Sequence, residues 1–411
     1  MVAAHKKHQR KILLMAPTGR AAKVMSGAAG KNAFTIHRSL YRPDVNNGGI
    51  ANFILSNNPH KNTTFVVDEA GLVATNNDST VGGNSLLEDL LTYVFSDPSN
   101  GLMLLGDPAQ LPPVGQPQSP ALTADWFIEA GINATEHTLR MVVRQALDSH
   151  ILKNATQLRK LIESDSSEPP KLIPGKDFIQ VEDVYHLQEI FERLYASNSE
   201  SNTMVVRSNK KANNYNQGIR GRIKFHEDQI SAGDQFMVVR NNYFWLSETS
   251  KMGFIANGEI GEVRSIRNLH ERYGLSFCEA TVVFIDYPTE DAIDVILNIS
   301  TLSSEGPALS NAQSNSLYEQ MVAKFSHLSS KKKMYEAIKN DPYHNALQVK
   351  FSYVITCHKS QGGQWKQVII EHPYLPNGPS PMYYKWLYTA LTRATQKAYL
   401  LGFPSDWFDV S

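Results

Sequence analysis

The sequence predicts an α/β protein with two domains built on parallel sheets and a small β-rich module inserted in the second. Short apolar segments alternate with helical stretches in both halves of the chain, as in sheets covered on both faces. From Gly233 onward the pattern changes to β-rich alternation broken by turn residues. With 411 residues, 42% of them hydrophobic, the chain can form two or three domains with their own cores.

The amino-acid composition restricts the kinds of binding partner but does not identify one. Lys plus Arg and Asp plus Glu both total 40, so nucleic acid could be held only by local clusters of charge. The two cysteines, Cys278 and Cys357, form no disulfide or metal-ligand pattern, which favours a reducing cytoplasm. No apolar run is long enough to span a bilayer, and Met1–Arg10 lacks the apolar core of a signal peptide, so no membrane partner is expected.

Three apolar strands are expected in the first domain, at Ile12–Ala16, Thr64–Val67 and Leu102–Leu105. Each ends in polar or turn-forming residues, and a helix over Arg20–Met25 follows the first. Ligands of open α/β sheets bind at the carboxyl ends of the strands, so these following residues are the first candidates for a site.

The second domain is expected to begin after a surface connection at Ser164–Gly175. Its predicted strands and helices, in order, are strand Thr203–Arg207, helix Asn209–Arg222, strands Val349–Thr356 and Gln367–Glu371, and helix Tyr384–Thr395.

Two insertions interrupt this plan. Tyr41–Lys61 is rich in Asn, Gly and Pro, which predicts a small hairpin. The β-rich segment predicts a small antiparallel barrel, followed by a loop over Thr301–Ser316 and a basic helical stretch to Asn340. The domains are therefore expected at 1–150 (hairpin at about 41–62), at 151–234 with 345–411, and, for the inserted module, at 235–344.

Asp68-Glu69, directly after the second strand, has the form of a Walker B element. An Asp in this position can hold Mg²⁺ through water, and a Glu can polarise an attacking water. Taken alone, two acids after a strand are more often a solvated strand end.

The string Gly101–Gln116, GLMLLGDPAQLPPVGQ, is more specific. A strand leads into Gly-Asp-Pro, and then into a Gln and two prolines that stiffen the loop. Gln110 could hydrogen-bond a terminal phosphate or the attacking water, and the stiff loop would transmit that state. A simple Pro-rich turn is the alternative.

These two elements resemble motifs II and III of superfamily 1 DNA helicases of the RecD/Dda-like, 5′-to-3′ branch. Further motifs follow the family order over nearly the whole chain. They are Ala16–Lys23 (motif Ia), Thr35–Leu40 (the element after it), Val143-Arg144-Gln145 (motif IV), Thr356–Gly362 (motif V), Tyr388–Ala394 (motif VI) and Gly233–Gly261 (entry to an SH3-like subdomain). The resemblance implies two RecA-like domains with an SH3-like insertion, ATP and Mg²⁺ as cofactors, single-stranded DNA as partner, and family roles in DNA repair and recombination.

The resemblance also implies roles for single residues at the nucleotide. Asp68 would bind Mg²⁺, and Glu69 would be the catalytic base. Gln110, Arg144 and Arg393 would surround the γ-phosphate, with Arg393, on the predicted helix Tyr384–Thr395, delivered like an arginine finger. Gly362 and Gln364 would contact the nucleotide, although the family often has an acid where this chain has Gly363-Gln364.

A second set would contact DNA, in the way that backbone N–H groups, hydroxyls and single positive charges suit a phosphate backbone. These residues are Pro17, Thr18, Gly19, Arg20, His37, Thr356, His358, Lys359 and Ser360. Outside their motifs, His37 and His358 would be read as structural histidines. The hairpin matches the position of the family's strand-splitting pin. Tyr243, Phe244, Trp245 and Trp365 could stack on bases, but core packing is their more common use.

One family element does not occur. The phosphate-binding loop G-x-x-x-x-G-K-[ST] is found nowhere, and Gly27–Asn32 has the wrong glycine spacing for it. We expect the missing strand to be central in the first sheet, so that its loss leaves two unpaired edges. An amino-terminally shortened helicase is one interpretation, and a DNA-binding relative without ATP turnover is the other. The first is favoured because the active-site acids and arginines are present.

Overall fold

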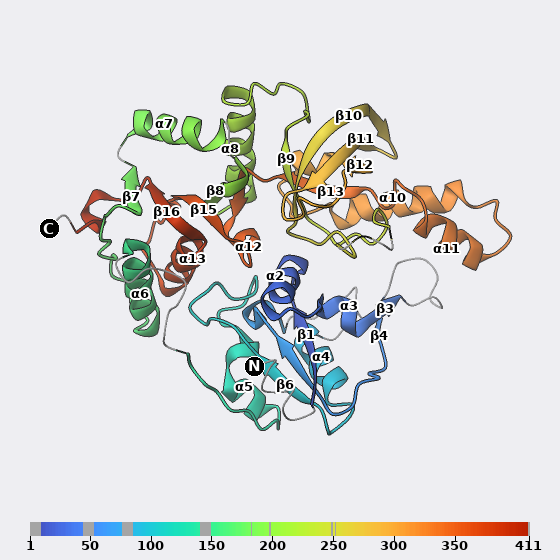
Figure 1. Ribbon diagram of the computed structural model, residues 1–411, viewed down its shortest axis with the longest axis horizontal. Coiled ribbons are helices and arrows are strands. Elements are labelled where there is room, and N and C mark those ends of the chain that lie inside the picture. The colour runs from blue at the N-terminus through green and yellow to red at the C-terminus, as the bar shows by residue number, and fades with distance from the viewer. Residues whose placement is uncertain are drawn as a thin grey trace. The chain divides into compact units, whose positions relative to one another are not determined.

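The computed structural model describes residues 10–43, 53–75, 85–139, 149–181, 183–196, 199–247, 250 and 252–409. The chain forms two compact units, Met1–Arg144 and Gln145–Ser411 (Figure 1). Arg144 and most of the predicted hairpin tip lie outside the described residues. None of the helices in these ranges is long and apolar enough to cross a membrane.

The first unit contains a four-stranded parallel sheet of order β2-β1-β5-β6. The strands are β1 (Lys11–Ala16), β2 (Ala33–Thr35), β5 (Thr63–Val67) and β6 (Gly101–Leu104), and its helices are α2 (Gly19–Ala29), α3 (Ile36–Leu40), α4 (Leu86–Val94) and α5 (Ala124–Glu129). Phe65 of β5 packs with Leu87, Leu90 and Val94 of α4 in a core that excludes solvent. β3 (Tyr41–Pro43) and β4 (Phe53–Leu55) pair as a two-stranded antiparallel sheet inside the predicted hairpin.

The sheet corrects one expectation. Its four strands are hydrogen-bonded without a break, so no central gap with two unpaired edges is present among the described residues. Instead, β6 is an edge strand of the described sheet, and all four of its residues are partly exposed, whereas all five residues of β5 are buried. The open edges of the described sheet are β2 and β6, so a strand added to this sheet would pair at an edge and not divide β1 from β5.

The second unit is built on a five-stranded parallel sheet of order β14-β8-β15-β16-β7. Two helices cover each face, α7 and α8 on one and α6 and α13 on the other (Figure 1). The strands are β7 (Phe178–Val181), β8 (Asn202–Val206), β14 (Val354–Thr356), β15 (Trp365–Glu371) and β16 (Ala394–Leu401), and the helices are α6 (His150–Glu163), α7 (Val184–Tyr195), α8 (Asn209–Arg222) and α13 (Pro381–Leu391). The two parallel sheets confirm the α/β class and the two RecA-like domains.

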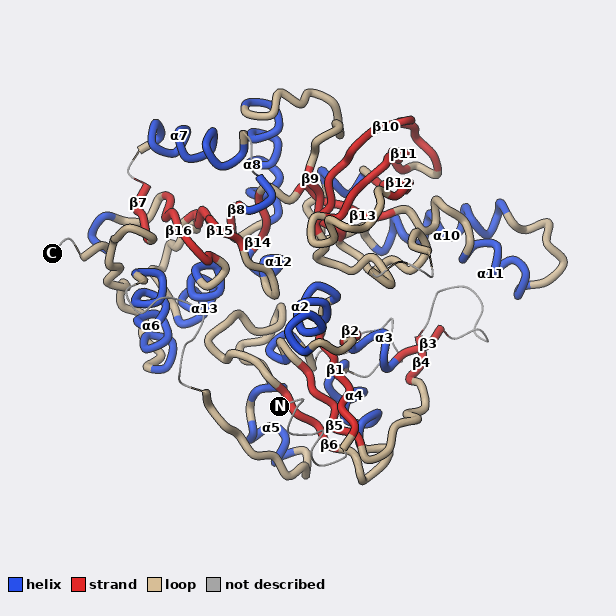
Figure 2. Tube along the Cα trace, viewed as in Figure 1, coloured by secondary structure: helices blue, strands red, loops and turns tan. Residues whose placement is uncertain are grey.

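A closed five-stranded barrel is attached to this sheet (Figure 2). It consists of β9 (Gln235–Val238), β10 (Ile260–Arg272), β11 (Leu275–Phe284), β12 (Ile293–Asn298) and β13 (Leu347–Phe351). The barrel is not wholly antiparallel as expected, because β12 and β13 pair in parallel. Between them lie α9 (Ser300–Ser303), α10 (Asn311–Lys324) and α11 (Lys331–Lys339), so the predicted loop is partly helical. Its likeness to an SH3 fold stays a prediction.

A buried ionic network joins the barrel to α8. Asp234, immediately before β9, is fully buried and accepts hydrogen bonds from Arg220 Nε at 3.0 Å, the Ser231 N–H at 2.8 Å and the Tyr353 hydroxyl at 3.1 Å. Arg220 Nη2 lies 2.9 Å from the same carboxylate. The guanidinium also lies over the Phe351 ring, 4.4 Å from its centroid. Each buried charge is thus paired, which makes its burial tolerable.

Candidate nucleotide and nucleic-acid site

Three loops meet at the carboxyl edge of the first sheet, because β1, β5 and β6 are parallel neighbours. The Asp68 N–H donates to Met15 O at 2.9 Å, which joins the ends of β5 and β1. The Leu105 N–H donates to Val67 O and the Ala70 N–H donates to Leu105 O, both at 2.8 Å, which joins the ends of β5 and β6. The sequence-predicted segments Pro17–Arg20, Asp68-Glu69 and Gly106–Gln110 therefore emerge side by side.

The backbone at Glu69 is unusual. This residue has φ 51° and ψ 35°, the left-handed region that residues with a side chain rarely adopt. The preceding Asp68 holds the turn, since its Oδ1 accepts the Glu69 N–H at 2.9 Å. Both acids are partly exposed at the strand end. Strain of this kind concentrates at functional sites, where side-chain direction matters more than local stability.

The Glu69→Gly variant is expected to be more stable than the parent chain. Glycine adopts the left-handed conformation without the cost to a side-chain residue, so the free energy of unfolding should rise by about 0.5–1 kcal/mol. Urea denaturation followed by circular dichroism measures this. Glu129→Gly, in the last turn of α5, is the control and should be destabilised. A loss of stability in Glu69→Gly equal to that of the control would show that Glu69 carries no strain.

The loop after β6 needs its glycine. A Cβ on Gly106 would lie 2.8 Å from Leu122 Cδ1 and 3.1 Å from the backbone nitrogen of Gly71, closer than packed atoms allow. The loop then folds back at Asp107, whose backbone oxygen accepts the Gln110 N–H at 3.0 Å. Close approach of the two loops thus brings the region of Gln110 beside the Walker B segment.

Gln110 carries an unsatisfied polar atom. Its Oε1 is buried, and within the described ranges no donor lies within hydrogen-bonding distance. A buried acceptor without a partner costs about 1–3 kcal/mol, so such atoms call for an explanation. A bound water or ligand donating to this oxygen would supply one, which agrees with the sensor role that the motif implies.

Motif Ia begins helix α2. Thr18 is the N-cap, with its hydroxyl accepting the Ala21 N–H at 3.2 Å. Pro17 and Arg20 are partly exposed beside it, while Gly19 is buried. His37 lies on the exposed side of α3, with its ring centroid 5.6 Å from that of Tyr41. Together, Thr18, Arg20 and His37 give the first unit polar side chains near the ends of β1 and β2.

Motif V begins at the carboxyl end of β14. Thr356 is the N-cap residue of the short helix α12 (Cys357–Ser360), and Lys359 is partly exposed on it. Ser360 differs, because it is fully buried and its hydroxyl donates to Cys357 O at 2.7 Å. This geometry gives Ser360 a local structural role and does not favour the DNA contact implied by the resemblance.

A second lysine accompanies Lys359. Burial lowers the pKa of Lys359 to about 8, with the charge of Lys350 contributing. Lys350 lies in β13, is buried, and its pKa is likewise lowered to about 8 by burial. Both side chains line a small hollow between barrel and sheet, with Asn209 and Thr356. Sequence reasoning missed Lys350, although a lysine inside the apolar run Leu347–Phe351 was a usable signal.

The remaining predicted nucleotide contacts lie near the end of α13. Arg393 is not on that helix but in the turn between α13 and β16. It is 4% exposed, and its Nε donates to Thr389 O at 3.0 Å and its Nη1 to Gly363 O at 3.3 Å. Gly362 has φ 74°, which explains a glycine there. Gln364 is exposed beside it.

The aromatic residues considered for base stacking differ in how far they are buried. Trp365 is 4% exposed, and Trp245 is held by its Nε1 donating to Asn345 O at 2.8 Å. Tyr243 is 56% exposed and stacks on Phe254, with ring centroids 5.0 Å apart. Trp365 therefore serves the core, and Tyr243 is the aromatic ring best placed to meet solvent.

The residues present fit a nucleotide with Mg²⁺. No cluster of three His, Cys, Asp or Glu residues that could hold a metal occurs in the described ranges. Mg²⁺ in nucleotide sites needs no such cluster, since it uses one or two carboxylates, waters and the phosphates. Asp68 offers the carboxylate, and the unpaired Oε1 of Gln110 offers an acceptor at the same sheet edge.

Two family models match the chain. Residues 1–164 match an AAA domain, and residues 351–401 match the UvrD-like helicase C-terminal domain. No curated protein matches. Among solved structures, Pif1 helicase from Bacteroides in complex with ADP-AlF3 and ssDNA is 15% identical, with a TM-score of 0.49 over 98% of this chain and 85% of that one. Pif1 helicase from Candida albicans is also 15% identical, with a TM-score of 0.44 over 98% and 87%. At these scores the likeness alone assigns nothing further.

The fold defines two units built on parallel sheets of RecA type. Asp68 and Glu69 follow a strand of the first sheet, and the segment Thr356–Gly362 begins at a strand end of the second. The two family matches agree with the ordered motifs on which the recognition rests. The chain therefore combines a match to an AAA domain with a match to the UvrD-like helicase C-terminal domain, and its ordered motifs resemble those of superfamily 1 helicases.

Proposed function

We propose that this chain forms the motor of an ATP-dependent DNA helicase that moves 5′-to-3′ along single-stranded DNA. The observation that carries the proposal is the convergence of Thr18, Asp68-Glu69 and Gln110 at one edge of a parallel sheet. Parallel α/β sheets bind ligands at that edge. The direction of movement comes from the family resemblance alone.

In this proposal each side chain at the edge has a separate task. Asp68 holds Mg²⁺, which when bound neutralises phosphate charge. Glu69, aimed by its left-handed backbone, accepts a proton from the attacking water. Gln110 receives a hydrogen bond from that water at its unpaired oxygen. Arg393 is proposed to act at the phosphates only after some of its present backbone contacts are exchanged.

The DNA contacts are proposed to come from both units. Thr18 and the exposed His37 serve the first unit, and Thr356, His358 and Lys359 serve the second. Hydroxyls and single positive charges bind a phosphate backbone without reading its sequence. A chain with no net charge can therefore hold a single strand through these local groups.

A second candidate is a DNA-binding relative without ATP turnover, favoured by the absence of G-x-x-x-x-G-K-[ST] from the 411 residues. We propose that this polypeptide by itself hydrolyses no ATP, because backbone amides of that loop and its lysine normally hold the phosphates. The acids, the strained Glu69 and the unpaired Gln110 oxygen favour a motor over the non-catalytic alternative.

The pH dependence of DNA binding tests the proposed contact of Lys359. A DNA phosphate binds Lys359 in its charged ammonium form. Binding therefore raises the pKa of Lys359 above its value of about 8 in the free protein. The affinity for DNA should therefore be highest below pH 8 and should fall as the pH rises above 8. For one such group, the fall is about tenfold between pH 7 and pH 9. Fluorescence anisotropy with a labelled oligo(dA), whose bases do not titrate in this range, measures it.

The matched control is Lys359→Arg, which stays charged throughout. Its affinity should change much less over the same range, and any remaining slope belongs to Lys350. A decline that persists unchanged in Lys359→Arg would refute the contact.

A further inference from the structure

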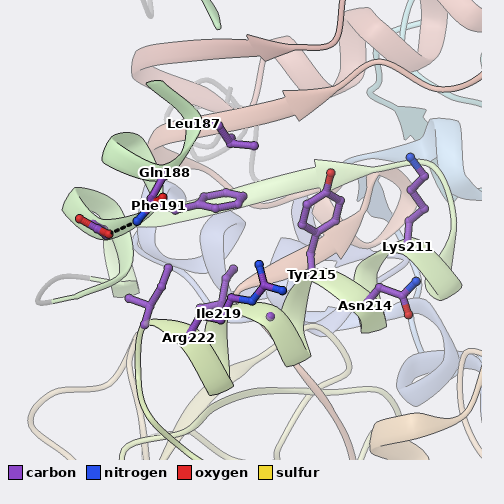
Figure 3. Close-up of a pocket in the computed structure, with 11 residues that line it drawn as sticks. Leu187, Gln188, Phe191, Lys211, Asn214, Tyr215, Ile219 and Arg222 are labelled. Carbon is purple, nitrogen blue, oxygen red and sulfur yellow. Dashed lines mark hydrogen bonds between the residues drawn. The ribbon is translucent and has the colours of Figure 1, made fainter. Parts of the chain in front are cut away.

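Two hollows lie against different faces of α8, and their lysines have different electrostatic surroundings. The wider hollow, about 730 Å³, lies between α7 and α8 and includes Phe191 in its wall (Figure 3). Its lysine, Lys211, is neutralised by Glu371, with Nζ 2.6 Å from Oε1. The smaller one, the lysine hollow, holds about 10 Å³ between α8, β13 and β14 and is lined by Lys350 and Lys359. None of the described residues in its walls is acidic, so these walls hold two positive charges and no counter-charge.

Lys350 is buried on the barrel side of the lysine hollow. It is 5% exposed, and burial alone lowers the pKa of its ammonium group to about 8. One of its N–H groups donates to Ser304 O, which leaves two of the three without an acceptor in the described part of the chain. A buried charge is normally paired with an opposite charge. A ligand that brings a negative charge into the hollow would therefore stabilise Lys350.

Lys359 lies on the sheet side of the lysine hollow and reaches solvent. It is partly exposed, and its ammonium group makes no hydrogen bond or ion pair with any residue that the structure describes. Burial and then the charge of Lys350 lower the pKa of Lys359, so the two ammonium groups are close enough to repel each other. Thr356 adds a hydroxyl that makes no capping bond to α12. Three hydrogen-bond donors thus line one hollow.

The size of the lysine hollow restricts what can enter it. A volume of about 10 Å³ is close to the space that one water molecule needs. A nucleobase or a whole phosphate group is too large, whereas one non-bridging oxygen of a phosphate fits. The side-chain amides of Asn209 and Asn213 already donate to the backbone oxygens of Glu305 and Ser304, both at 3.0 Å. The two lysines and the threonine hydroxyl are therefore the donors that an entering oxygen would meet.

We propose that the lysine hollow receives one non-bridging oxygen of a DNA backbone phosphate, with Lys350 as a second phosphate contact beside Lys359. The inference rests on the proposed binding of single-stranded DNA. Lys359 holds the phosphate at the solvent side, and Lys350 donates to the inserted oxygen. Since Lys350 belongs to the barrel and Lys359 to the sheet, one phosphate ties both parts of the second unit to the DNA. Such a contact is independent of base sequence.

Lys350→Met tests the proposal, because it removes the charge and keeps a side chain of similar length. At pH 7 its affinity for a labelled oligo(dA), measured by fluorescence anisotropy, should be about tenfold lower than that of the parent chain, the value of one charge-assisted contact. The slope of log affinity against log salt should become smaller by about 0.7, the share of one phosphate on a single strand. Lys350→Gln, which can still donate to Ser304 O, should show the same losses.

The matched control is Lys171→Met, at an exposed lysine outside the hollow, which should keep the affinity and the salt slope of the parent chain. The melting temperature separates a binding role of Lys350 from a structural one. Ser304 O keeps the Asn213 amide as a donor, so Lys350→Met should melt no lower than the parent chain. A structural lysine would give a lower melting temperature with an unchanged salt slope, which would overturn the proposal.

The remaining outcomes separate this inference from the proposed function. If the parent chain binds the single strand and both Lys350 variants bind it with the same affinity and salt slope, the inference fails and the proposed function stands. The inference also fails if Lys350→Gln recovers the affinity of the parent chain, or if Lys171→Met loses as much affinity as Lys350→Met. A parent chain that binds no single strand would overturn the proposed function, and this inference with it.

Discussion

Replacing Asp234 by alanine lowers the free energy of unfolding of the second unit by about 3–5 kcal/mol, because it leaves Arg220 buried without its counter-charge. The guanidinium is 2% exposed and cannot reach water without moving α8 away from the barrel. The Tyr353 hydroxyl and the Ser231 N–H lose an acceptor in the same change. Loss of this magnitude would consume much of the stability of an ordinary domain.

Urea denaturation followed by tryptophan fluorescence measures this effect, since four of the five tryptophans lie in the second unit. Asp294→Ala is the control. Its ion pair with Arg267 spans 2.7 Å but lies at the surface, so its loss should lower the free energy of unfolding far less than the loss of Asp234 does. Equal costs for the two variants would contradict the role assigned to the buried network.

Addition of a phosphate-binding loop is expected to create ATP hydrolysis, which we propose that the 411-residue chain lacks. The added segment is designed to supply a strand that pairs with the partly exposed edge strand β6, followed by G-x-x-x-x-G-K-[ST] and a helix. Phosphate release in the presence of single-stranded DNA should then exceed that of the 411-residue chain at least about 100-fold. The reason is that the new loop would hold the phosphates beside groups already in place at the ends of β5 and β6.

Glu69→Gln in the loop-bearing chain separates catalysis from binding. Loss of a general base costs about 10²–10⁴-fold, so hydrolysis should return nearly to background while nucleotide binding persists. Alanine in place of the loop lysine is the second control. Hydrolysis by the 411-residue chain well above its own Glu69→Gln variant would contradict the proposal that the loop is required.

The positions of β1, β5, β6, β8 and β15 followed from local sequence. The predicted strand Val349–Thr356 is instead two strands, β13 in the barrel and β14 in the second sheet, and β2 and β7 were not predicted. Apolar runs such as Thr64–Val67 allow few alternatives when a turn and polar residues follow directly. The start of α13 was missed, although Ser380 and Pro381 are a usual N-cap and first-turn pair. The prediction placed this helix too late in the chain and so put Arg393 on it, when Arg393 lies in the turn beyond.

Non-local features could not be predicted in the same way. The parallel pairing of β12 with β13 joins Leu297 to Leu347 across the inserted helices, and no local pattern encodes that register. The edge position of β6 depends on strand order and not on the apolarity of Gly101–Leu104. The unpaired oxygen of Gln110 and the left-handed Glu69 arise from loop geometry, which residue type alone does not determine.

The most direct test of the account is the relative affinity of the 411-residue chain for single-stranded and duplex DNA of the same length. Anisotropy titrations at two salt concentrations measure both. The account predicts that the single strand binds at least about tenfold more tightly and that added salt weakens binding, as expected for phosphate contacts. Equal affinity for the duplex, or no binding of the single strand at low salt, would contradict a motor that tracks one DNA strand.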